Sequence, residues 1–177
     1  MRIDGTVLAL PFDGIDTDQI IPARHLTVIE PGGLGKYLFS GHPELDARLA
    51  AAPDASILVA GADFGCGSSR EHAAWALRER GFRAVIALSF ARIFLENAYN
   101  NGIVPIALEA SGVAACAASA TLEIEVDNEA VVTASGERFA FALDPLRKTF
   151  LSGGGYLNYL NAKIPAIRAW VAARATH

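Results

Sequence analysis

The sequence is poor in cysteine. Its 177 residues include only Cys66 and Cys116, and neither belongs to a Cys-x-x-Cys pair. A structural zinc site takes four ligands and a cubane iron–sulfur cluster usually takes several thiolates, so a standard cysteine cage within this chain is excluded. At most one disulfide can form, and a cytoplasmic setting disfavours even that one.

Long apolar runs and an excess of basic residues are also lacking. No stretch reaches the roughly 18 apolar residues that span a bilayer, and residues 1–11 lack the basic and apolar regions of a signal peptide. The 15 basic and 19 acidic side chains give a formal net charge of −4 at pH 7, which removes the electrostatic basis of non-specific nucleic-acid binding. We therefore expect a soluble, cytoplasmic protein that binds neither membranes nor nucleic acids.

Apolar residues, in contrast, are abundant enough for a sizeable core. The chain is 52% hydrophobic and 19% charged, and its length suits one domain over residues 1–177. Glycines and prolines gather between about 26 and 54, with only a weak helical run at 44–52. Loops longer than about 12–15 residues in a compact domain are often functional lids, so we expect a mobile loop at about 26–54.

Outside that loop, strand and helix patterns alternate. Buried strands are predicted at 56–60, 84–88 and 103–108, with helices at 68–80 and 91–101 between them. This order implies parallel strands with crossover helices. Further elements are expected in this order: a strand at 3–10, short antiparallel strands at 121–126, 131–134 and 138–142, and helices on either side of Gly153-Gly154-Gly155. The predicted class is α/β with mixed parallel and antiparallel strands.

Glycines and side chains able to bind a ligand are concentrated at residues 61–72. Gly61, Gly65 and Gly67 precede Ser68-Ser69-Arg70 at the predicted start of a helix. Glycines let the backbone approach a ligand closely, and the free amides at a helix start attract negative charge. The planar guanidinium of Arg70 suits a carboxylate or a phosphate. We expect an anion here, and a carboxylate fits well.

Other interpretations of the same residues stay open. Ser68 or Ser69 can be an ordinary helix cap, and His72 can be a structural histidine. A phosphate site is disfavoured because the loop contains neither GxGxxG nor GxxxxGK[ST], and a hydrolase nucleophile because Gly65–Ser69 is not GxSxG. From another functional class, a non-catalytic anion- or nucleotide-binding module is the alternative.

Three ordered segments carry a family resemblance: Asp-Thr-Asp-Gln-Ile-Ile-Pro at 16–22, Phe-Gly-Cys-Gly-Ser-Ser-Arg-Glu-His-Ala at 64–73, and Ser-Phe-Ala-Arg-Ile-Phe at 89–94 with Asn97 and 100–102. They resemble the signatures of the aconitase-superfamily swivelling domain, and more narrowly those of the free-standing small subunits of isopropylmalate dehydratases. The resemblance implies a three-layer β/β/α fold and a hydro-lyase that interconverts 2- and 3-isopropylmalate by dehydration and rehydration, in leucine biosynthesis. Related dehydratases of homoaconitate, dimethylmalate or a citrate-like substrate stay open.

The same resemblance implies a partner and a cofactor. A large subunit would carry a [4Fe-4S] cluster whose unligated iron acts as a Lewis acid on a dicarboxylic substrate. This chain would hold no cluster of its own and would work only in a heterodimer or heterotetramer. The scarcity of cysteine in this chain agrees with a cluster that is held by the large subunit alone.

The resemblance also implies catalytic residues. Ser68 matches the base that removes a proton next to a carboxylate. A free serine is a very weak base in water, so the site must stabilise an alkoxide through amides, a helix terminus and nearby cations. Asp18 joins the catalytic set, where it is expected to position neighbouring groups by hydrogen bonds.

Substrate-binding residues follow in the same way. Ser69 and Arg70 match residues that hold a substrate carboxylate, and Thr17 belongs to the same set. Val28 and Ile29 offer an apolar patch that favours a branched alkyl group.

Overall fold

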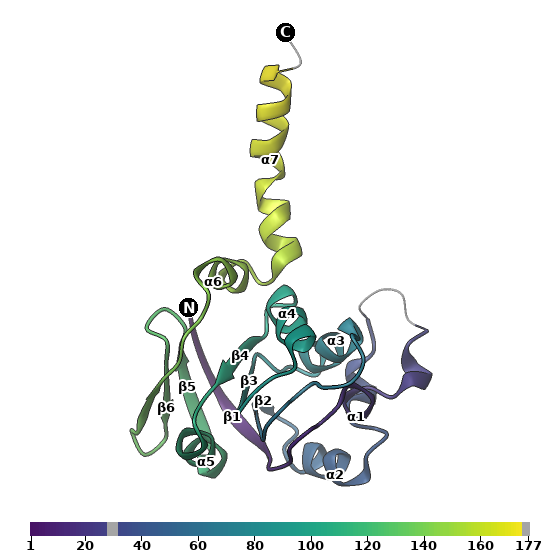
Figure 1. Cartoon of the computed structure of the whole chain (residues 1–177), viewed down its shortest axis with the longest axis vertical. Helices are drawn as coiled ribbons and strands as arrows, with labels where there is room; N and C mark the ends of the chain where they lie inside the picture. The colour runs from purple at the N-terminus through teal and green to yellow at the C-terminus, as the bar shows by residue number, and fades with distance from the viewer. Residues whose placement is uncertain (28–31, 175–177) are drawn as a thin grey trace.

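A seven-stranded sheet forms the centre of the computed structural model, which describes residues 1–27 and 32–174 (Figure 1). Its strands lie in the order β4-β3-β2-β1-β5-β6-β7. In chain order they are β1 (Arg2–Leu10), β2 (Ala55–Ala60), β3 (Ala84–Ala87), β4 (Val104–Ala107), β5 (Thr121–Glu125), β6 (Ala130–Thr133) and β7 (Arg138–Ala140).

Strand β1 separates the parallel half of the sheet from the antiparallel half. It pairs in parallel with β2, and β2, β3 and β4 continue the parallel half. On its other side β1 pairs antiparallel with β5, which leads to β6 and β7. Helices α3 (Glu71–Glu79) and α4 (Arg92–Asn100) are the crossovers of the parallel half. The predicted mixed α/β class of the swivelling domain is therefore confirmed.

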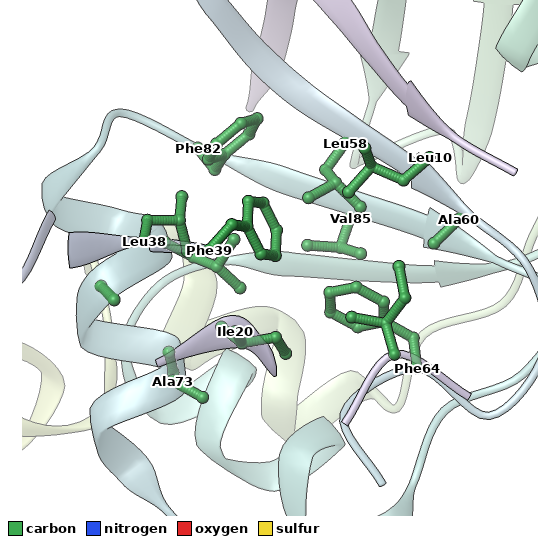
Figure 2. Packing of buried hydrophobic residues seen from close by; sticks show 14 of the residues in the cluster. Leu10, Ile20, Leu38, Phe39, Leu58, Ala60, Phe64, Ala73, Phe82 and Val85 are labelled. Carbon is green, nitrogen blue, oxygen red and sulfur yellow. The ribbon is translucent and has the colours of Figure 1, made fainter. Parts of the chain in front are cut away.

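Both faces of the parallel half are buried. Leu58 and Val85 face one apolar cluster, while Ile57 and Ile86 face a second cluster on the opposite side. Figure 2 shows the first cluster, where strand residues such as Leu58 pack against Phe39 and other side chains outside the sheet. Burial on both faces explains why these strands read as continuous apolar runs.

The sequence analysis did not predict the helix that follows β4. Helix α5 (Ala110–Ala118) packs against β1 and β2, with Cys116 in the second apolar cluster. Its sequence, ASGVAACAA, has almost no polar residues, so it lacks the alternation between a polar and an apolar face that marks a surface helix. Its run of alanines, the best helix former, was the signal available.

The predicted start of the first crossover helix is wrong. Helix α3 begins at Glu71 with Arg70 at its N-cap, three residues after the expected Ser68, and no side chain caps it. Arg70 has extended backbone angles, φ −89° and ψ 111°, and its amide donates to the Ser68 carbonyl at 2.8 Å, so the helical conformation starts only at Glu71. Ser68 and Ser69 therefore lie in a loop and are not helix caps.

The segment expected to be a mobile loop contains anchored parts. Leu34, Leu38 and Phe39 are buried in the first cluster, and helix α2 (Pro43–Ala51) confirms the weak helical run. The carboxylate of Glu79 accepts hydrogen bonds from the amides of Leu34 and Gly35 at 2.6 and 3.0 Å. The mobility of residues 26–54 stays a prediction. Any movement of this segment that preserves the contacts above must leave the anchored residues in place.

The chain ends in two helices. Asp144 caps α6 (Pro145–Ser152), and Gly153-Gly154-Gly155 separates it from α7 (Tyr156–Arg174), as predicted. Helix α7 projects away from the body of the protein (Figure 1). Among the described residues, no helix is long and apolar enough to cross a membrane.

Gly65 provides a test of how tightly the loop is packed. In Gly65→Ala the new Cβ would lie 2.2 Å from Cγ of the buried Phe94, in a left-handed conformation. We expect the free energy of unfolding to fall by about 2–4 kcal/mol, measured by urea denaturation. Gly14→Ala is the control because its φ is +64° with no atom within 4 Å, so strain alone should cost about 1 kcal/mol. Equal losses would contradict the packing.

Candidate functional site

The loops that leave β1, β2 and β3 meet at one edge of the sheet. Because these strands are parallel, their carboxyl ends lie at the same edge, where α/β proteins commonly bind ligands. The loops are residues 11–16, 61–70 and 88–91. The motif predicted to carry the chemistry lies in the middle one.

Backbone hydrogen bonds fix this middle loop from both sides. Gly65 donates to the carbonyl of Ile15 at 2.8 Å, and Thr17 donates to that of Cys66 at 2.9 Å. On the other side, Phe64 donates to Ser89 at 3.0 Å. The loop thus extends the pairing of the sheet beyond its strands, and its backbone positions are set before any ligand binds.

Ser68 and Ser69 lie at the surface of this fixed loop. Both residues are exposed, as is the preceding Gly67. Within residues 1–27 and 32–174, neither serine hydroxyl has a hydrogen-bond partner, whereas the Ser68 carbonyl accepts from both Arg70 and Thr17. The backbone of Ser68 is therefore held and its hydroxyl is available to a ligand.

Thr17 occupies a different place from the one a substrate-binding residue needs. It is 2% exposed, and its hydroxyl donates to the Ser68 carbonyl at 3.0 Å. This hydrogen bond lies beneath the loop that carries Ser68 and Ser69, which we call the serine loop, and links that loop to α1 (Thr17–Ile20). Direct contact between Thr17 and substrate does not fit this burial, so Thr17 supports Ser68 from below.

Asp18 and Arg70 form an ion pair above that contact. The Arg70 guanidinium donates to the Asp18 carboxylate, and their side chains are 19% and 56% exposed. Asp18 is brought there by α1, whose start is fixed by a capping box between Asp16 and Gln19. The bond to Asp18 uses one N–H group of the guanidinium, so a second carboxylate can bind to the others.

Three carboxylates lie around the glycine loop. Burial raises the pKa of the Cys66 thiol, and the carboxylates of Asp63 and Asp16 raise it further. Asp13 adds a third carboxylate, which accepts from the amide of Ala62 at 2.6 Å. The described side chains around the loop thus include three carboxylates beside the guanidinium of Arg70.

The residues do not fit a metal cluster held by this chain alone. No group of three or more His, Cys, Asp or Glu able to hold a metal ion occurs in the described part of the chain. The Cys66 thiol donates a hydrogen bond to the carbonyl of Gly14. Cys116 is buried, and this burial raises the pKa of its thiol to about 11. Thiolates are the metal-binding form of cysteine, so neither residue is prepared for that role.

Two predicted residues are not described by the structure, and one residue that fixes the loop was not predicted. Val28 and Ile29 fall outside the described residues, so their proposed contact with an alkyl group stays a prediction. The sequence analysis missed Ser89, whose hydroxyl accepts from the amide of Asp63 at 2.8 Å and helps fix the loop. Two signals were available for this residue: its position directly after a predicted strand and its place at the start of the motif at 89–94.

Comparison with known proteins agrees with this arrangement. The model of the aconitase C-terminal domain matches residues 3–111, which contain all three loops of the site. A 3-isopropylmalate dehydratase small subunit from Herpetosiphon aurantiacus is 45% identical, covering 95% of this chain and 90% of the relative. The corresponding subunit from Anaeromyxobacter sp. strain K is 41% identical, covering 97% and 96%.

A solved structure extends the likeness to the fold. The crystal structure described as 3-isopropylmalate dehydratase from Methanocaldococcus jannaschii superimposes with a TM-score of 0.79 and 34% identity, covering 96% of this chain and 98% of that one. The match includes the predicted fold, the order of the motifs and almost the whole length. The chain therefore belongs to the aconitase C-terminal domain family and, within it, to the small subunits of 3-isopropylmalate dehydratase.

Proposed function

We propose that this chain is the small subunit of a hydro-lyase that interconverts 2- and 3-isopropylmalate in leucine biosynthesis, and that it works only when joined to a large subunit. The observation that carries the proposal is the free Ser68 hydroxyl on a loop whose backbone is hydrogen-bonded from both sides. The names of the relatives supply the substrate and the reaction.

Ser68 acts as the proton acceptor in this proposal. Dehydration removes a proton from the carbon next to a carboxylate and a hydroxide from the adjacent carbon, which leaves isopropylmaleate and water. Rehydration returns the proton and the hydroxide to exchanged carbons. The two hydrogen bonds to the Ser68 carbonyl fix the backbone that carries the hydroxyl, so the hydroxyl needs only a side-chain rotation to reach one carbon of a bound diacid.

Arg70 and Ser69 hold the substrate, and Asp18 positions Arg70. The guanidinium offers further N–H groups beside the one that Asp18 uses, so a substrate carboxylate can bind to its free edge. Ser69 adjoins this position and adds a hydroxyl donor. Together they turn the reacting C–H bond toward Ser68.

The large subunit completes the site. The carboxylates of Asp13, Asp16 and Asp63 crowd the loop, so the positive charge that an alkoxide needs has to come from across an interface. The exposed serines lie where a second protein can reach them. In this proposal the [4Fe-4S] cluster and all its ligands belong to that subunit, because the residues described here do not form a cluster site.

Reconstitution tests the function directly. Co-expression with a candidate large subunit, followed by an anaerobic assay of isopropylmaleate hydration, should give activity that neither chain has alone. Parallel assays with the unsaturated intermediates of homoaconitate, dimethylmalate and citrate dehydratases compare kcat/KM among the alternative substrates. No gain over the separate chains would contradict the proposal, and nucleotide binding by the lone chain in calorimetry would favour a binding module.

Replacing the serine hydroxyls separates proton transfer from binding. Ser68→Ala should lower kcat of the reconstituted enzyme by about 10²–10⁴-fold with little change in KM, because a positioned base acts only in the reaction step. Ser69→Ala, a matched change one residue away, should mainly raise KM. Steady-state kinetics provides both values, and an equal rise in KM for the two variants would reassign Ser68 to binding.

Asp18→Asn tests the positioning role of the ion pair. The amide keeps the shape of the carboxylate but loses its charge, so Arg70 should be held less firmly. We expect kcat/KM to fall roughly 10-fold, mostly through KM, as for the loss of one hydrogen bond to a charged group. Arg70→Lys, which keeps the charge without the planar fork, should raise KM in the same way. A lower KM in Asp18→Asn would show that Asp18 competes with substrate instead of positioning Arg70.

A further inference from the structure

Asn101 ties the end of one crossover helix to the start of the other. It is the C-cap residue of α4, and its side-chain nitrogen Nδ2 donates to the Glu71 carboxylate at 3.0 Å. The same nitrogen donates to the carbonyl of Asn97 at 2.9 Å. Both of these oxygens can only accept, so the nitrogen of the amide must face them and its two hydrogens are both used. The direction of the Asn101 side chain is therefore set by its surroundings.

The backbone of Asn101 is held by α3 as well. The Arg78 guanidinium donates to the Asn101 carbonyl and, at 3.3 Å, to the carbonyl of Gly154. Glu71 and Arg78 are seven residues apart, so they lie on the same side of α3, two turns from each other. Asn101 thus contacts α3 near both of its ends.

The start of α3 depends on this contact. Within residues 1–27 and 32–174, no side chain caps the N-terminus of α3. The Glu71 carboxylate lies at the positive end of the helix dipole, which is favourable but leaves an exposed side chain free to turn. The hydrogen bond from Asn101 gives that carboxylate one direction, so the first turn of α3 is joined to α4 and not to a cap.

Apolar packing does not supply the same control. Helices α3 and α4 are in contact, and Leu77 and Ala98 belong to the same apolar cluster. The hydrophobic effect is non-directional, so this packing holds the two helices together without selecting one position for the first turn of α3. A hydrogen bond weakens steeply when its geometry changes, so the bond between Asn101 and Glu71 does select one.

Arg70 is joined to that first turn. It lies directly before Glu71, and its amide donates to the Ser68 carbonyl at 2.8 Å. Its own carbonyl accepts from the amide of Ala73 at 3.3 Å. The backbone of Arg70 therefore connects the serine loop to the start of α3, and a shift of the first turn moves the guanidinium away from its place beside Asp18.

We propose that Asn101 is a positioning residue for the dehydratase reaction, which holds Arg70 where its guanidinium meets a substrate carboxylate. Asn101 acts through the Glu71 carboxylate and not by contact with the substrate. The role of Arg70 in this inference rests on the proposed function, whereas the link from Asn101 to Arg70 is a property of this chain alone.

Nuclear magnetic resonance of the lone chain tests the link without a large subunit. The Arg70 Nε–H signal, identified by its loss in Arg70→Lys, should shift in Asn101→Asp, because a carboxylate cannot donate to Glu71 and repels it. Asn100→Asp is the matched control, since it adds the same charge on an exposed neighbouring residue whose side chain bonds to no described residue. An Arg70 signal that stays in place in Asn101→Asp, or shifts equally in both variants, overturns the proposal.

Kinetics of the reconstituted enzyme tests the consequence. Asn101→Asp should raise KM about 10-fold and change kcat less than about 3-fold, because a displaced Arg70 binds substrate less well while Ser68 keeps its own supports. Asn100→Asp should change neither value more than about 2-fold. An unchanged KM in Asn101→Asp overturns the positioning role. A wild-type complex without activity counts against the proposed function instead, and the spectra of the lone chain still decide the link.

Exchanging the two partners separates a direct link from a general loss of packing. In Glu71→Gln combined with Asn101→Asp, the donor and the acceptor change places, so the hydrogen bond forms again without like charges. KM should return to within about 3-fold of the wild-type value. A KM no lower than that of Asn101→Asp alone overturns the proposal. Circular dichroism monitors folding, and Asn101→Ala, which removes the donor without adding charge, should raise KM about 3-fold where Asn101→Asp does not fold.

Discussion

The backbone pairing between the loops after β1 and β2 is the constraint on which the candidate site depends. Gly65 and Thr17 exchange hydrogen bonds with Ile15 and Cys66, and the Thr17 hydroxyl adds a third link to Ser68. Gly65 adopts the left-handed backbone angle that the loop requires, and the buried Thr17 supports the loop from below. The backbone that carries the Ser68 hydroxyl thereby acquires a fixed position, which a proton acceptor needs.

Much of this architecture is readable from the sequence because it rests on local patterns. The apolar runs at 56–60 and 84–88 predict strands that are buried on both faces, and the glycines at 65 and 67 predict a close approach of the backbone. The start of α3 was less predictable, since serines before a helix usually cap it. Here tertiary hydrogen bonds to a distant loop override that local preference.

Other features depend on contacts between distant segments and have no local signature. Thr17 lies in a motif of polar residues, but its burial follows from the position of Ser68 above it. The negative surroundings of Cys66 arise because Asp16 and Asp63 meet across two loops. Likewise, the sequence predicts a helix at the C-terminal end, but the projection of α7 follows from the packing of Gly154 and Gly155 on residues 100–102.

The central place of β1 also affects how the chain is made. Residues 2–10 are synthesised before both of the strands that flank them, since β2 follows some 45 residues later and β5 more than 110 residues later. Until β2 and β5 have been synthesised, the backbone groups along both edges of β1 are unpaired. Unpaired strand edges make a nascent chain prone to aggregation. Pairing of such distant segments is intrinsically slow, so early synthesis is the stage at which this protein most needs a chaperone.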